Sequence, residues 1–86
     1  MFIKISVYVE FPFMENEEVV FVKKFGNHLK DLRLAKNLSQ EMLANDANIP
    51  INQIGRIERA EISTSLSTVY KIAKALEIES KELFNF

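Results

Sequence analysis

The stretch from Leu38 to Ala60, LSQEMLANDANIPINQIGRIERA, constrains the fold of this chain more than any other. Ser39 is a favourable N-cap residue, so a short helix is expected to begin directly after it. Residues 48–50 (Asn-Ile-Pro) interrupt that helix, because asparagine tolerates left-handed backbone angles and the residue before a proline avoids helical ones. A second helix is expected from about Pro50 to Arg59, since proline is tolerated at the first helical position. The pattern predicts two short helices joined by a tight turn.

The second of these helices has two different faces. At 100° per residue, Ile57 and Glu58 lie within about 60° of Ile54, which predicts a face that packs on the first helix. The opposite face carries an amide and two guanidinium groups, on Asn52, Arg56 and Arg59. Such groups recognise adenine and guanine edges or bind phosphates. Two short crossed helices with this outward face are typical of a helix-turn-helix.

The stretch resembles the phage repressor/Cro-type (XRE) family of helix-turn-helix proteins. The usual pattern of that family is close to LSQEELA, a Gly-Val turn, a recognition helix and IERG. The corresponding segments here are LSQEMLA, Asn48-Ile49, residues 50–56 and IERA. The resemblance continues through Ser65-Leu66, residues 72–76 and Leu83-Phe84, and so covers roughly residues 25–84. It implies a mainly α fold, a five-helix lambda-repressor-like DNA-binding domain.

The resemblance also implies roles for individual side chains. Gln40, at the start of the first short helix, is expected to hold a DNA phosphate together with nearby backbone N–H groups. Ile51, Asn52 and Arg56 are expected to face base edges in the major groove, and Arg59 to touch the DNA backbone. For Ile51, core packing is an equal alternative to contact with a thymine methyl group. Asn52 and Arg56 have the alternative of being ordinary exposed residues.

Arg33 and Glu58 are expected to form a structural ion pair. In the resembled family an arginine at this place pairs with the glutamate of IERG, which is Glu58 here. An independent reason is that Glu58 falls on the buried side of its helix, where an unpaired carboxylate is costly. The alternative for Arg33 is a solvated charge on the preceding helix.

Several positions depart from the family pattern. Asn48, Ala60 and Glu77 stand where glycines are common, so the helix before Ala60 is expected to run on or to end differently. Glu61 places a negative charge where family members often carry a basic residue near the DNA backbone. Gly55, inside the recognition helix, costs roughly 1 kcal/mol of helix propensity relative to alanine.

The first 24 residues lie outside the resemblance. Residues 2–11, FIKISVYVEF, alternate apolar and polar side chains, which predicts a strand, and Val19–Phe25 is a shorter stretch of similar type. Residues 12–18 are expected to form the loop between them. We therefore expect a β-strand or hairpin extension over residues 1–24 and a helix-turn-helix domain over residues 25–86. The extension pairs with that of a second chain, packs on its own helices, or is a disordered addition with Met14 as the natural start.

The remaining helices follow from apolar periodicity. One helix is expected over roughly residues 28–37, with Gly26-Asn27 capping or interrupting its approach and Leu29, Leu32 and Ala35 facing inward. Ser65 or Ser67 is expected to cap another helix, and a short last turn covers residues 80–84. The inward-facing residues of the helix that ends near residue 76 are expected to be Leu66, Val69, Tyr70, Ala73 and Leu76. In the resembled family the last region often contributes to dimer contacts, which makes Phe84 and Phe86 candidates.

The net charge of the chain argues against a nucleic-acid partner, but the distribution of charge along the chain makes that argument weaker. The 86 residues carry 11 Lys and Arg against 12 Asp and Glu, a net charge of -1, whereas affinity for DNA comes largely from cation–phosphate contacts. However, five basic residues and one aspartate give residues 23–36 a net charge of +4. A chain with such a charge split can still carry a basic face.

The length allows one domain, and the composition excludes several classes of protein. The chain has no cysteine, which excludes disulfides and thiolate metal sites. No apolar run approaches about 20 residues, so no membrane span is expected. No nucleophile–base arrangement predicts catalysis.

The sequence therefore predicts a DNA-binding transcriptional regulator, a repressor, that acts as a cytoplasmic homodimer on double-stranded DNA. No cofactor, metal, membrane or enzymatic activity is expected. The alternative is a protein-interaction module, such as an antitoxin-like partner, that uses the N-terminal strand.

Overall fold

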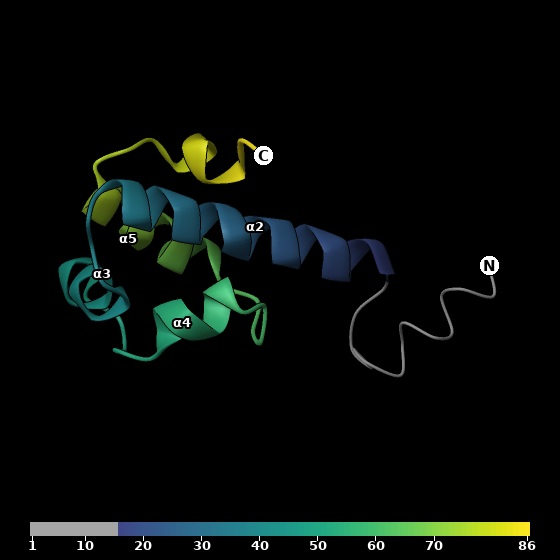
Figure 1. Ribbon diagram of the computed structural model, residues 1–86, viewed down its shortest axis with the longest axis horizontal. Coiled ribbons are helices and arrows are strands. Elements are labelled where there is room, and N and C mark those ends of the chain that lie inside the picture. Colours follow the sequence, from purple (N-terminus) through teal and green to yellow (C-terminus); the bar gives the residue numbers. More distant parts are fainter. Residues whose placement is uncertain (1–15) are drawn as a thin grey trace.

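The computed structural model describes residues 16–86, which form a helical domain (Figure 1). Its elements are α2 (Asn16–Ala35), α3 (Gln40–Ala47), α4 (Gln53–Glu58), α5 (Leu66–Leu76) and the 3-10 helix η1 (Ser80–Phe84). α3 packs on α4 and α5, while α2 packs on α4 and η1. The largest fully buried side chains of the core are Leu29, Leu43, Ile54, Ile57, Ile72, Leu76 and Leu83. None of the described helices is long and apolar enough to cross a membrane.

The predicted β extension is wrong where the structure describes it. Val19–Phe25 lies inside α2, which runs unbroken from Asn16 to Ala35, and residues 16–86 contain no strand. Val19, Phe25 and Leu29 are buried and Val22 is half-buried, a spacing of three or four residues that suits a helix. This packing outweighs the β propensity of the valines. The predicted strand over residues 2–11 lies outside the described residues.

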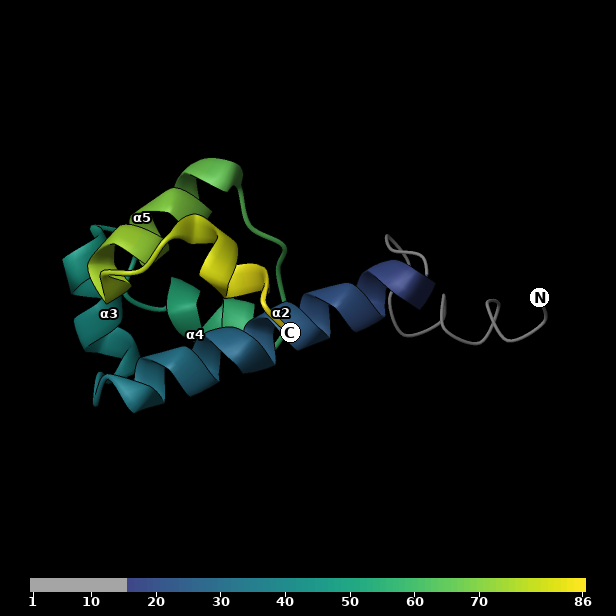
Figure 2. The ribbon, with the colours of Figure 1, turned by 90° about the horizontal axis from the view of Figure 1, so that it is seen from above.

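The early start of α2 gives the domain an uneven outline. Figures 1 and 2 both show its N-terminal part extending beyond the other helices. Glu17 and Glu18 lie in its first turn, where negative charge stabilises a helix. Gly26 and Asn27, predicted to cap or interrupt this region, lie within the helix instead.

The prediction of five helices is also wrong, because the described residues form four α-helices. The last element, η1, is a five-residue 3-10 helix, a form common in short terminal pieces. Ala35, Leu66 and Tyr70, predicted to face inward, are exposed. Ile72 is fully buried and takes a place in the core that the prediction did not give it.

All four α-helices end in the same hydrogen-bonded turn without glycine. The left-handed residues are Asn37, Asn48, Ala60 and Glu77, with φ of 59° to 61°. The N–H of the next residue donates to the carbonyl oxygen five positions back: Leu38 to Arg33, Ile49 to Ala44, Glu61 to Arg56 and Ile78 to Ala73, at 2.9 to 3.2 Å. This is the Schellman motif. The expectation that the helix before Ala60 runs on or ends differently is wrong, because α4 ends at Glu58 and Ala60 adopts the left-handed conformation in place of the usual glycine.

Gly26 lies where α2 meets the C-terminal end of α4. A Cβ atom at this position would lie 2.5 Å from the carbonyl oxygen of Ile57 and 2.7 Å from that of Glu58. Both are backbone atoms, so no side-chain rotation can relieve the overlap. The absence of a side chain at Gly26 therefore sets how closely the two helices approach.

Arg33 and Glu58 join the same two helices through a buried, bidentate contact. Arg33 Nε donates to Glu58 Oε2 at 2.7 Å, and Arg33 Nη2 donates to Glu58 Oε1 at 3.1 Å. Arg33 Nη1 donates to the carbonyl oxygen of Leu38 at 2.7 Å. The two side chains are only 7% and 2% exposed. Because each charge has its opposite partner in good geometry, the cost of burying them is largely offset.

Replacement of Gly26 by alanine should destabilise the protein by about 1–3 kcal/mol, the usual cost of overpacking. This loss is expected although alanine has the higher helix propensity. Urea denaturation followed by circular dichroism measures it, with Asn27→Ala, an exposed neighbour in the same helix, as control. Equal midpoints for the two variants would show that the close approach does not depend on glycine.

Arg33→Ala should lower the free energy of unfolding by about 3–5 kcal/mol, because it leaves the Glu58 carboxylate buried and without its cation. The same denaturation experiment tests this, with Lys30→Ala as a matched loss of an exposed basic side chain in α2. A variant as stable as the Lys30→Ala control would contradict a structural role for the pair.

Candidate nucleic-acid interface

α4 buries one face and exposes the other. Ile54, Gly55, Ile57 and Glu58 are buried. The predicted DNA-contacting residues of this region are all exposed, namely Ile51, Asn52, Arg56 and Arg59. Ile51 is 52% exposed, so it is not a core residue. The exposed face of this region therefore carries an amide and guanidinium groups, while the buried face packs on the rest of the domain.

The chain enters α4 through a turn that leaves the Asn52 side chain available. α4 begins at Gln53, later than expected, because the Gln53 N–H closes a turn on the carbonyl oxygen of Pro50 at 3.0 Å. Asn52 occupies the N-cap position, but its side chain makes no capping hydrogen bond. Its carboxamide can therefore offer both a donor and an acceptor to a partner, which is the combination that recognises adenine.

Gln40 connects the buried ion pair to the surface. It is the first residue of α3, next to the N-cap Ser39, whose side chain accepts from the Met42 N–H at 3.0 Å. Gln40 Nε2 donates to Glu58 Oε1 at 2.9 Å. Since a carboxamide nitrogen carries two hydrogens, one donor remains for another acceptor.

Gly55 makes room for this arrangement. A Cβ atom there would lie 2.9 Å from Gln40 Oε1 and 2.9 Å from Arg59 Nη1. The glycine inside α4 thus lets two polar side chains lie against the helix in these positions.

Arg56 and Arg59 both pair with Glu61. Arg59 Nε donates to Glu61 Oε2 at 2.7 Å and Arg59 Nη2 to Glu61 Oε1 at 3.4 Å. Arg56 Nε lies 3.8 Å from Glu61 Oε1. The hydrogen bond raises the pKa of Arg59 and lowers the pKa of Glu61 from their ordinary values. Glu61 thus neutralises part of the positive charge that the sequence placed on this face.

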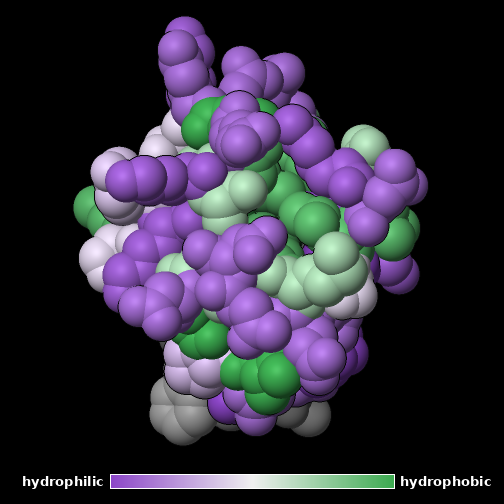
Figure 3. Space-filling view, turned by 90° about the vertical axis from the view of Figure 1, so that its left-hand side faces the viewer, coloured by the Kyte–Doolittle hydropathy of each residue, from purple (hydrophilic) through white to green (hydrophobic). Residues whose placement is uncertain are grey.

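A polar hollow beside α4 brings in residues that the sequence pattern alone does not single out. Lys23, Asn27 and Lys30 of α2 line it together with Gln40 and Arg59. These three residues share one face of α2, at spacings of four and three, once the helix is known to extend to Asn16. The end of the domain where α3 lies is mainly hydrophilic, with smaller hydrophobic areas (Figure 3). No cluster of three or more potential metal ligands occurs within residues 16–86.

Comparison with known proteins agrees with this geometry. Residues 29–83 match the family described as Helix-turn-helix, HTH_3. The chain is 40% identical over 63 residues to the control protein C.BamHI of Bacillus amyloliquefaciens, covering 72% of this chain and 78% of that protein. It is 34% identical over 71 residues to the control protein C.SmaI of Serratia marcescens, covering 83% and 79%.

The fold is similar to that of solved proteins as well. The restriction-modification controller protein C.AhdI from Aeromonas hydrophila superimposes with a TM-score of 0.72 at 44% identity, covering 73% of this chain and 96% of that one. An HTH_3 family transcriptional regulator from Vibrio cholerae gives a TM-score of 0.73 at 35% identity, covering 77% and 37%. The resemblance inferred from the sequence is confirmed: this chain belongs to the HTH_3 (XRE) family of helix-turn-helix DNA-binding transcriptional regulators.

Proposed function

We propose that the protein controls transcription within a restriction-modification system, binding a specific operator in the cytoplasm as a homodimer. The proposal is supported by the relatives, which are named as control proteins or as a restriction-modification controller. The chain covers more than three quarters of each of those three proteins. It acts as a repressor when the operator overlaps a promoter.

The division of α4 into a buried face and an exposed face is the observation that best supports sequence-specific DNA binding. The buried face is fixed to α2 by the Arg33–Glu58 pair, and the exposed face carries Asn52 and Arg56. A rigid helix with an exposed amide and guanidinium suits the major groove, where Asn52 can bind adenine and Arg56 guanine. Ile51, at the turn, supplies an apolar contact to a thymine methyl group.

Backbone contacts position the helix on the duplex. Gln40 donates its remaining N–H to a phosphate, close to the start of α3, and Arg59 contacts the backbone from the opposite end of α4. The Glu58 hydrogen bond fixes the Gln40 carboxamide before DNA arrives. No catalytic group is needed for this role.

Selection from a random duplex library at low salt should recover a motif with two-fold symmetry and half-sites about 34 Å apart. Asn52→Ala/Arg56→Ala should lose it, since each bidentate base contact contributes about 1–3 kcal/mol of discrimination. Lys71→Ala/Lys74→Ala, with two exposed residues of α5, is the control that should keep the motif.

Weak binding without sequence preference, equal in the wild type and the Asn52/Arg56 variant, would contradict base recognition by α4. The affinity of the protein for the selected motif should also fall steeply as the salt concentration rises, because phosphate contacts release counterions.

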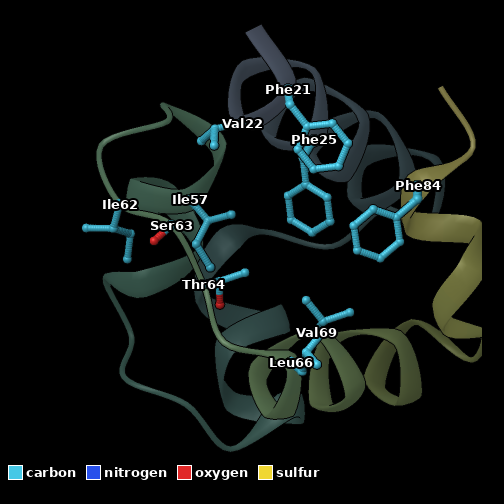
Figure 4. A pocket seen from close by; sticks show the side chains of 10 residues that line it. All are labelled: Phe21, Val22, Phe25, Ile57, Ile62, Ser63, Thr64, Leu66, Val69 and Phe84. Atoms are coloured by element: carbon cyan, nitrogen blue, oxygen red, sulfur yellow. The ribbon is translucent and has the colours of Figure 1, made fainter. Parts of the chain in front are cut away.

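An apolar groove on another part of the domain suits the second subunit (Figure 4). Its walls come from the N-terminal half of α2, the loop before α5, and η1. Phe21 and Phe84 stack with their ring centroids 6.3 Å apart, and Phe84 lies 5.1 Å from Phe25. At the rim, Leu66 is 83% exposed. None of the proposed DNA-contacting residues lines this groove.

We assign this groove to a second copy of the chain, with the same surface used by both subunits. Symmetric dimers use self-complementary patches, and exposed apolar surface of this kind favours burial between subunits. The predicted interface residues Phe84 and Phe86 lie at or near it, with Phe86 5.5 Å from Phe21 between ring centroids.

Leu66→Glu should convert the dimer to monomer at micromolar concentration, because it places a charge in the apolar interface. Leu66 is the first residue of α5, where a carboxylate is compatible with the helix. Sedimentation equilibrium measures the mass. The control is Leu34→Glu, which changes an exposed leucine near the C-terminal end of α2, outside the groove. A wild-type monomer, or a Leu66→Glu dimer as tight as wild type, would contradict this assignment.

A further inference from the structure

Glu61 differs from the corresponding residues at the other helix ends. In the four Schellman motifs, the residue after the left-handed one is Leu38, Ile49, Glu61 or Ile78. The three apolar residues pack against the hydrophobic core. Glu61 is exposed instead, and its carboxylate points back to α4 and contacts two arginines. This position is therefore not used for packing.

The contact is built into the fold of the helix end. The Glu61 N–H donates to the Arg56 carbonyl oxygen at 2.9 Å, which fixes the backbone of Glu61 one turn beyond Arg56. From there its carboxylate meets Arg59 at 2.7 Å and approaches Arg56 at 3.8 Å. The nearby Glu58 carboxylate is already bound by Arg33 and Gln40, which leaves Glu61 as the acceptor for Arg59.

From this geometry we propose that Glu61 is an affinity-limiting residue that competes with DNA phosphates for Arg59 and also attracts the neighbouring Arg56. The inference rests on the proposed DNA-binding role of those two arginines. In the free protein the carboxylate accepts hydrogen bonds from Arg59 Nε and Nη2 and lies 3.8 Å from Arg56 Nε. When DNA binds, a phosphate must displace it, and the carboxylate then lies close to the polyanion.

The strength of the contact suits such an exchange. The Arg56, Arg59 and Glu61 side chains are 47%, 56% and 47% exposed, so water and salt screen their attraction. The buried Arg33–Glu58 pair, by contrast, is inaccessible to phosphate. A weak exposed pair lowers affinity for every duplex without preventing binding where base contacts supply the remaining free energy.

The penalty acts on operator and unrelated DNA alike, because both offer a phosphate to Arg59. Non-specific binding consists almost entirely of cation–phosphate contacts, whereas an operator also offers base contacts. Glu61 therefore reduces retention on unrelated sequences, in a chain whose net charge is already -1.

Glu61→Gln tests the proposal, since it removes the charge and keeps the size of the side chain. Fluorescence anisotropy with the full chain measures affinity for the selected operator and for an unrelated duplex of equal length. We expect affinity for the unrelated duplex to rise about 3- to 10-fold, with a salt slope steeper by about one. The affinity for the operator should rise by a similar factor, because the same phosphate contact of Arg59 is released in both complexes.

Two further variants separate the proposed exchange from a general effect of charge. Glu77→Gln makes the same change in net charge at the exposed end of α5 and should leave both affinities nearly unchanged. In an Arg59→Ala background the gain from Glu61→Gln should shrink to less than half, because the arginine that it releases is absent.

Three results would overturn the proposal: equal affinities for wild type and Glu61→Gln, an undiminished gain in the Arg59→Ala background, or weaker operator binding by Glu61→Gln. The last would mean that Glu61 orients the arginines for binding. The unrelated duplex tests the role of Glu61 independently of operator recognition. If Glu61→Gln raises affinity for this duplex but the wild type prefers no sequence, the proposed operator recognition fails and the role of Glu61 stands.

Discussion

The buried pair of Arg33 and Glu58 fixes where α4 lies against α2. α4 has only six residues, too few to be stable as an isolated helix, so its position depends on its contacts. Ile54 and Ile57 supply the apolar part of these contacts, and Gly26 lets α2 come close to the end of α4. The ion pair adds direction, because a bidentate guanidinium–carboxylate contact fixes both orientation and distance. A helix held in this way can offer its exposed side chains in one defined arrangement.

The same carboxylate links the core to the surface. Glu58 accepts from Arg33 on its buried side and from Gln40 at the edge of the proposed DNA face. Three residues further along the chain, Glu61 makes an ion pair of the opposite character, which is exposed and easily exchanged. One helix end thus combines a permanent ion pair that supports the fold with a replaceable one that limits charge. The exposed pair lowers the positive charge that α4 presents, in a chain whose net charge is -1.

The sequence predicted the central helices well because their signals are local. The Ser39 cap, the turn at Asn48 and the two faces of α4 follow from neighbouring residues and agree with the structure. Val19–Phe25 was predicted incorrectly because valine-rich segments favour strands unless distant residues provide a helical packing surface. The pairing of Glu61 with two arginines depends on the left-handed turn at Ala60, which no composition or periodicity reveals. The Arg33–Glu58 contact could be predicted from the sequence, because the family resemblance and the expected burial of the carboxylate both indicated it.

We expect α4, which Arg33 holds from its buried side, to meet DNA with its exposed face. Backbone amide NMR during titration with the selected operator tests it most directly, because each residue reports separately. The largest shift changes should fall at the start of α3, near Gln40, and around Asn52 to Arg56. Changes confined to the apolar groove near Leu66 and Phe84, with α4 unaffected, would contradict the account.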